Sequence, residues 1–145
     1  MKLTRYSDYS LRVLMYLAVR PEYLATIDEI SNAYGISRAH LVKVVHQLGR
    51  AGFVETVRGR GGGIQLARAP EEISIGRVVR HTEENLAIVE CFEPTTSHCR
   101  IESACGLRGV LEEALDAFLE TLDRYTLADL VARRRKPLAL LLTAP

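Results

Sequence analysis

Long uncharged segments are missing from this chain of 145 residues. The most extended one, PLALLLTAP at the C-terminal end, is far too short to span a bilayer. The first residues, MKLTRYSDYSLRVLMYLAV, carry charges throughout and do not resemble a signal peptide. We therefore expect a cytoplasmic protein and not a membrane-spanning or exported one.

Cysteine is scarce, with three residues that all lie between positions 91 and 105. An odd number of thiols in a reducing compartment argues against a disulfide framework and favours metal or redox chemistry. Internal repeats and low-complexity segments are absent as well. With 48% hydrophobic and 26% charged residues, the composition is that of a globular chain that buries a core.

A strong overall charge is also lacking, because the formal net charge is +1, but the two halves of the chain differ. Residues 1–70 carry ten Lys and Arg against five Asp and Glu, whereas residues 71–145 carry nine against thirteen. Clustered cations attract the phosphates of nucleic acids. The N-terminal half is therefore the half that we expect to contact DNA.

The N-terminal half contains the pattern of a helix-turn-helix. A largely apolar segment from 4 to 19 predicts a buried helix, and Thr26 to Glu29 forms a capping box for a second one that ends at Gly35. Ser37 caps a third helix to about residue 49, with an apolar stripe at Leu41, Val44, Val45 and Leu48. The start of such a helix reads base edges in the major groove. The predicted DNA contacts are Ser37, Arg38, Ala39, His40 and Lys43, together with Thr26.

A strand, a glycine-rich tip and a second strand follow in FVETVRGRGGGIQLAR, which predicts the wing of a winged helix. Arg58, Arg60, Gly61 and Gly62 at the tip are expected to approach DNA phosphates or the minor groove. A nucleotide-binding loop is disfavoured because a strand, not a helix, follows the glycines. A solvated hairpin turn remains the alternative.

The C-terminal half predicts a short helix capped by Ser74 and a longer one after the cysteines. In the longer helix apolar residues recur from Leu107 to Tyr125, which we interpret as a dimerisation helix, with burial inside one subunit as the alternative. Thr126 to Asp129 predicts a last cap, and the basic run Arg133 to Lys136 either ends that helix in solvent or contacts DNA.

The predicted fold class is thus mainly α with a small β-wing: a winged helix-turn-helix domain plus a long dimerisation helix. The expected division is a DNA-binding domain at 1–80, a cysteine loop at 81–106 and the dimerisation helix with a C-terminal tail at 107–145.

The spacing of Cys91, Cys99 and Cys105, with gaps of seven and five residues, is wider than in zinc ribbons and fingers. Wide gaps between thiolates suit an iron–sulphur cluster, which is larger than one ion. A zinc site and three structural or redox-active thiols stay open as alternatives.

LTRYSDYSLRVLMYLA, GRGGGIQLAR, the cysteine loop and CGLRGVLEEALDAFLETLDRYTLADL together resemble the iron–sulphur winged-helix repressors, the family that includes IscR, and especially its nitric-oxide-sensing members. The resemblance implies a homodimer with a cluster on Cys91, Cys99 and Cys105, and a 4Fe–4S cluster in preference to a 2Fe–2S one. It implies Asp8 of the other subunit as fourth ligand, with His98 as a rival. Arg108 stands where IscR-like members place a ligating histidine, so that pattern is not met.

The same resemblance implies a repressor that releases two-fold symmetric operator DNA when nitric oxide attacks the cluster, freeing genes for nitric-oxide detoxification. A regulator of the same family that senses iron or cluster supply is the alternative. An enzyme is not expected, because the sequence contains no flavin motif or substrate-site motif.

Overall fold

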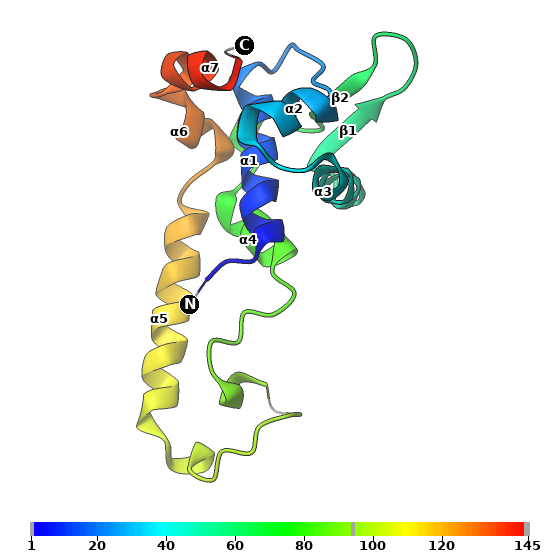
Figure 1. The fold of residues 1–145 in the computed structure, drawn as a ribbon. Coiled ribbons are helices and arrows are strands. Elements are labelled where there is room, and N and C mark those ends of the chain that lie inside the picture. The colour runs from blue at the N-terminus through cyan, green and yellow to red at the C-terminus, as the bar shows by residue number, and fades with distance from the viewer. Residues whose placement is uncertain (1, 94, 144–145) are drawn as a thin grey trace.

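The computed structural model describes residues 2–93 and 95–143, so position 94 of the cysteine loop and the last two residues of the predicted tail lie outside the described residues. The structure is mainly helical with one two-stranded sheet (Figure 1). Its helices and strands are α1 (Arg5–Val19), α2 (Ile27–Tyr34), α3 (Arg38–Arg50), β1 (Val54–Val57), β2 (Gly63–Leu66), α4 (Ile75–Thr82), α5 (Gly106–Asp123), α6 (Leu127–Ala132) and α7 (Arg135–Thr143). The predicted fold class is confirmed.

Helix α1 forms the centre of the core. Its residues Val13 and Leu14 are fully buried, and the helix contacts α3, α4, α6, α7 and β2. Burying a side chain of this size contributes about 1.5–3 kcal/mol. Thr4 caps the helix by accepting a hydrogen bond from the Ser7 amide at 3.2 Å. A helix that is apolar around most of its circumference is therefore surrounded by other elements, as its composition predicts.

Helices α2 and α3 form the helix-turn-helix. Both arms of the predicted capping box between Thr26 and Glu29 are present at the start of α2. Gly35 ends the helix with a φ of 64°, a left-handed conformation that glycine adopts without the steric cost of a side chain. The stripe of α3 that the sequence predicts is buried at Leu41, Val44, Val45 and Leu48.

Strands β1 and β2 pair antiparallel, with Val54 opposite Leu66 and Val57 opposite Gly63. The backbones of Ala25 and Ile64 exchange hydrogen bonds of 3.0 and 2.7 Å, which attaches the hairpin to the segment before α2. Val57 at the end of β1 is 40% exposed. The hairpin tip extends beyond the core at this point, as Figure 1 shows.

The chain returns to the N-terminal domain after α5. The Ile75 amide donates to Tyr125 O at 3.0 Å, and the Leu127 amide donates to Ile73 O at 2.8 Å. Helix α5 ends at Asp123, so Tyr125, the last member of the predicted apolar row, belongs to this connection. The capping box at Thr126 is present and begins α6.

Helix α7 was not predicted, because the C-terminal residues were interpreted as a tail. Only the first half of the basic run ends α6, while Arg135 and Lys136 form the first turn of α7. The Arg135 guanidinium donates to the carbonyl of Val19 at 3.0 Å, at the C-terminal end of α1. The run is thus partly structural, because one of its cations satisfies a terminal carbonyl of the core helix.

Helix α5 extends away from the N-terminal domain together with the segment between α4 and α5 (Figure 1). Its base is attached to α4, where Arg80 donates to both carboxylate oxygens of Asp123 at 2.6 and 2.7 Å. This hydrogen-bonded pairing lowers the pKa of Asp123. Among the described residues of α5 only Leu119 is buried, while Leu107 and Val110 are each 62% exposed. Within the described ranges, no helix has the length and apolar character needed to cross a membrane.

Candidate functional site

The recognition helix begins with a cap that also orients an exposed side chain. Ser37 Oγ accepts from the His40 amide at 3.4 Å and lies 2.9 Å from His40 Nδ1. Arg38 donates to Asp28 of α2 at 3.0 Å, so its guanidinium is directed along the surface. The residues predicted to read bases, Ser37, Arg38, Ala39, His40 and Lys43, are all exposed. Their contacts with DNA stay predictions.

Thr26, the remaining predicted contact near this helix, is exposed, but its hydroxyl already has partners. It donates to Glu29 Oε2 at 2.9 Å and accepts from the Glu29 amide at 3.2 Å. The hydroxyl therefore caps the N-terminus of α2, and any DNA contact at Thr26 stays a prediction.

The wing tip owes its shape to its glycines. Gly61 has a φ of 77°, and the Gly62 amide donates to Gly59 O at 3.0 Å. A Cβ at Gly62 would overlap the carbonyl oxygen of Val57, so no larger residue fits the turn. Arg58 and Arg60 are exposed on this turn and available for phosphates.

The segment between α4 and α5 is built from short turns. Single 3-10 turns occupy Glu90–Phe92, which contains Cys91, and Glu102–Ala104, which directly precedes Cys105. Cys91 is buried, Cys99 and Cys105 are partly exposed, and all three thiols are free. Cys105 directly precedes the first residue of α5, so the last predicted ligand is attached to the long helix.

Carboxylates hold this loop together. Glu90 accepts from the His98 amide at 2.5 Å, and Glu102 accepts from Ser97 Oγ at 2.7 Å. Arg108 joins the loop to α5, because it pairs with Glu102 at 2.8 Å and with Glu112 at 3.0 Å. The hydrogen bond with Glu112, followed by the charges of Glu112 and Glu102, raises the pKa of Arg108. The residue that replaces the IscR-type histidine is thus a structural cation.

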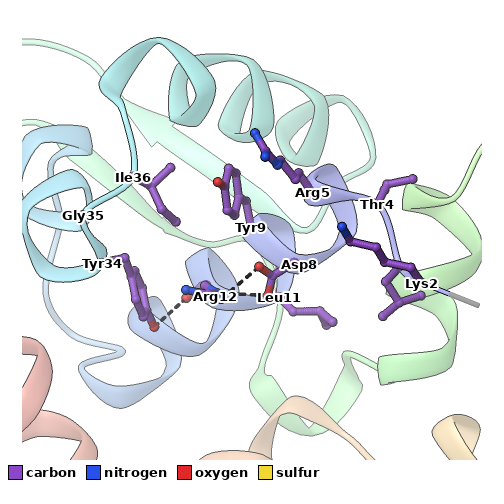
Figure 2. Close-up of a pocket in the computed structure, with 11 residues that line it drawn as sticks. Lys2, Thr4, Arg5, Asp8, Tyr9, Leu11, Arg12, Tyr34, Gly35 and Ile36 are labelled. Carbon is purple, nitrogen blue, oxygen red and sulfur yellow. Dashed lines mark hydrogen bonds and ion pairs between the residues drawn. The ribbon is translucent and has the colours of Figure 1, made fainter.

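Asp8, the predicted fourth ligand, lies on α1 and pairs with a residue one turn further along. Arg12 donates to Asp8 Oδ1 at 3.0 Å and approaches Oδ2 to 2.9 Å, and both side chains are a little under half exposed (Figure 2). The Tyr34 hydroxyl donates to the Arg12 carbonyl at 3.0 Å, and burial raises the pKa of Tyr34 to about 12. The Arg12 guanidinium lies 5.9 Å from the centre of the Tyr34 ring. A chain of contacts therefore runs from Asp8 to the last residue of α2.

A second link joins α1 to the root of the cysteine loop. Glu83, directly after α4, accepts from the Thr4 amide at 2.8 Å and from the Ser7 hydroxyl. The fully buried Ser7 in turn accepts from Thr82 at 2.7 Å. Sequence reasoning missed this link because it joins residues more than seventy positions apart, and no local pattern marks it.

The donors of the loop fit an iron–sulphur cluster in kind, because its thiols are free and cluster ligation requires free thiolates. Cys91, Cys99 and Cys105 would hold the cluster. In the described ranges, no group of three or more His, Cys, Asp or Glu side chains is gathered so as to hold a metal ion. His98, the rival ligand, is exposed.

Comparison with known proteins identifies the family of this chain. Residues 3–133 match the Rrf2 family, described as iron-dependent transcriptional regulators. The chain is 54% identical over 142 residues to the HTH-type transcriptional regulator NsrR of Bacillus subtilis, which covers 97% of both chains. It is 50% identical over 146 residues to the regulator of the same name from Halalkalibacterium halodurans, covering 100% of each.

The fold is also similar to those of solved regulators. CymR, the global cysteine regulator of B. subtilis, superposes with a TM-score of 0.75 at 28% identity, covering 92% of this chain and 98% of CymR. IscR of T. potens superposes with a TM-score of 0.76 at 26% identity, covering 94% of this chain and 90% of IscR.

The helix-turn-helix, the wing and these likenesses define a winged-helix, DNA-binding transcriptional regulator, and not an enzyme. The chain belongs to the Rrf2 family.

Proposed function

We propose that the protein is a homodimeric repressor that binds operator DNA with an iron–sulphur cluster in place and releases it in response to nitric oxide. The observation that carries the proposal is the position of the three cysteines, which all lie in the loop that joins the DNA-binding domain to α5. The name NsrR of relatives that are 50–54% identical over nearly the whole chain supports it. When bound, the cluster supplies iron that reacts with nitric oxide.

Dimerisation is supported by the apolar residues that α5 leaves uncovered. Leu107 and Val110 are each 62% exposed near the start of this helix. An apolar helix face that one subunit leaves in water is stabilised by a second copy that packs against it. Pairing through α5 brings two cysteine loops and two DNA-binding domains into one assembly, as a two-fold symmetric operator requires.

Asp8 completes the donor set in this proposal, acting on the cluster of the partner subunit. A carboxylate binds iron more weakly than a thiolate does and so leaves one iron open to a small molecule. Within its own chain Asp8 is bonded to Arg12, whose carbonyl accepts from Tyr34 at the end of α2. A change in the ligation of Asp8 is thereby coupled to the turn between α2 and α3.

The loop has a second connection to the DNA-binding domain through Glu83, which accepts from Thr4 and Ser7 at the start of α1. Glu83 lies eight residues before Cys91. A rearrangement of the loop that moves Glu83 disturbs the cap of the helix on which Asp8 lies. Both routes lead to α1, and α1 packs directly against the recognition helix.

Composition of the protein purified without air tests the cofactor. Iron, acid-labile sulphide, zinc and visible absorbance are measured on one sample of the wild-type chain and on Cys99→Ala. The proposal predicts iron and sulphide in near-equal amounts in the wild type and their loss in Cys99→Ala, which stays folded. The control Thr95→Ala, an exposed position in the same loop, retains the cluster. Zinc without sulphide would contradict the proposal.

A sensor of iron or cluster supply is the second candidate, because the family is described as iron-dependent. It would release DNA on iron chelation and respond little to stoichiometric nitric oxide. The two candidates therefore differ in the treatment, iron chelation or stoichiometric nitric oxide, that releases DNA from the cluster-loaded protein.

A further inference from the structure

The start of α1 borders the exposed side of the recognition helix. A groove of about 260 Å³ is lined by Arg5, Tyr6 and Tyr9 from α1 and by His40, Lys43 and Gln47 from α3. Two of these α3 residues, His40 and Lys43, belong to the predicted base-reading segment. The groove is therefore continuous with the surface that meets DNA.

Direct contact joins the two helices at this groove. The rings of Tyr9 and His40 lie 6.1 Å apart between their centres and are inclined at 50°. Figure 2 shows Arg5 and Tyr9 extending from α1 on the side of the recognition helix. Successive residues of an α-helix are rotated by about 100°, so Arg5 and Tyr9 form one row and Asp8 and Arg12 the next. The first two turns of α1 thus carry the candidate cluster ligand and the groove on neighbouring faces.

The charge of the groove suits an anion. Arg5 and Lys43 are both exposed, and neither forms an ion pair with any residue in the described part of the chain. Glu84 is the one acidic residue that lines the groove. By contrast, Arg38 at the start of α3 and Arg12 on the next row of α1 are each paired with an aspartate.

We propose that Arg5 and Lys43, with Tyr9 between the two helices, form a binding site for the phosphate backbone of duplex DNA beside the base-reading segment. This site rests on the DNA-binding function and adds α1 as a third contact element next to α3 and the wing. Phosphate contacts fix the register of a protein on its duplex. Because the site includes α1, movement of Asp8 on that helix is transmitted to the DNA backbone through Arg5.

The test measures binding of the cluster-loaded protein to a short random-sequence duplex as a function of salt concentration. Each neutralised phosphate contributes about 0.9 to the slope of log affinity against log salt. Arg5→Gln and Arg5→Met are expected to lower the slope by about 0.9 per subunit and to weaken binding several-fold at low salt. Arg5→Lys is expected to retain the slope. The matched control is Arg77→Gln, an exposed arginine on α4 outside the groove, which should match the wild type.

A wild-type slope in Arg5→Gln and Arg5→Met, with iron and sulphide contents unchanged, would overturn the site. So would a loss of thermal stability shared by Arg5→Gln and Glu84→Gln without a change in slope, because it would show that Arg5 pairs with Glu84. Failure of the wild type to bind any DNA would contradict the regulator function itself. Failure of the Arg5 variants alone to change the slope contradicts only this site.

Discussion

At the scale of single residues, the function depends on side chains whose partners are far away in the sequence. The cysteines and Asp8 could be singled out from their types, spacing and resemblance. The contact of Tyr34 with Arg12 could not, because these residues are 22 positions apart and lie on different helices. The ion pairs of Arg108 join residues that are close in the sequence, but they were missed as well. Charged residues near one another are normally solvated, so their presence predicts no specific pairing.

Asp8→Asn tests the fourth ligand. An amide is a weaker iron ligand than a carboxylate, so the variant is expected to keep its three thiol ligands but to change its visible spectrum and lose iron faster than the wild type. Losing an acid from the first turn of a helix costs only about 0.3–1 kcal/mol, so the fold should persist. Spectra and iron release are measured under anaerobic conditions.

Asp28→Asn is the matched control for that variant, because Asp28 is also a first-turn acid paired with an arginine. It should leave the spectrum and iron release unchanged. If Asp8→Asn behaves in the same way as this control, Asp8 is not a ligand.

At the scale of secondary-structure elements, helix starts were the most predictable feature. Thr26, Ser37, Ser74 and Thr126 all cap the helices that the sequence assigned to them. These caps are local, since the side-chain hydroxyl accepts a hydrogen bond from an amide two or three residues away. Helix α7 escaped prediction because its first turn is basic, against the helix dipole, and it is held by packing and by Arg135 on Val19.

The hydrogen bonds that join the start of α1 to the end of α4 through Glu83 give the prediction at this scale. Glu83→Ala removes the acceptor for Thr4 and Ser7 and leaves a buried hydroxyl with one partner fewer. The free energy of unfolding is expected to fall by about 1–3 kcal/mol. Glu84→Ala, at the neighbouring position, should stay within about 0.5 kcal/mol of the wild type, as exposed substitutions usually do. The free energies of unfolding of both variants are measured by denaturant titration. Equal free energies would show that the hydrogen bonds of Glu83 do not stabilise the fold.

At the scale of the whole molecule, the way in which α5 and the cysteine loop extend from the rest of the chain is consistent with the proposed dimer (Figure 1). One subunit leaves Leu107 and Val110 in water, and the apolar periodicity that predicted this helix could not by itself distinguish a partner from its own core. The exposure of these two residues supports the proposed dimer, because only Leu119 of α5 is buried within the chain. Each cysteine loop therefore lies beside the surface that we assign to the dimer.

Val110→Glu is expected to convert the dimer into a monomer at micromolar concentration, because dimerisation would bury an unpaired carboxylate. Sedimentation equilibrium measures the change in mass. Asp116→Asn is the control, since it removes a charge from an exposed position on the same helix and adds no carboxylate. It should remain dimeric. If Val110→Glu also remains a dimer, α5 is not the interface.

The central claim is that nitric oxide acting on the cluster controls DNA binding. It is tested most directly by titrating the cluster-loaded wild-type protein anaerobically with nitric oxide while it is bound to a duplex selected from a random pool by the protein itself. Fluorescence anisotropy of the duplex and visible absorbance are followed together. The account predicts that DNA is released in step with the change in the cluster spectrum. A cluster spectrum that changes fully while operator affinity stays constant would contradict it.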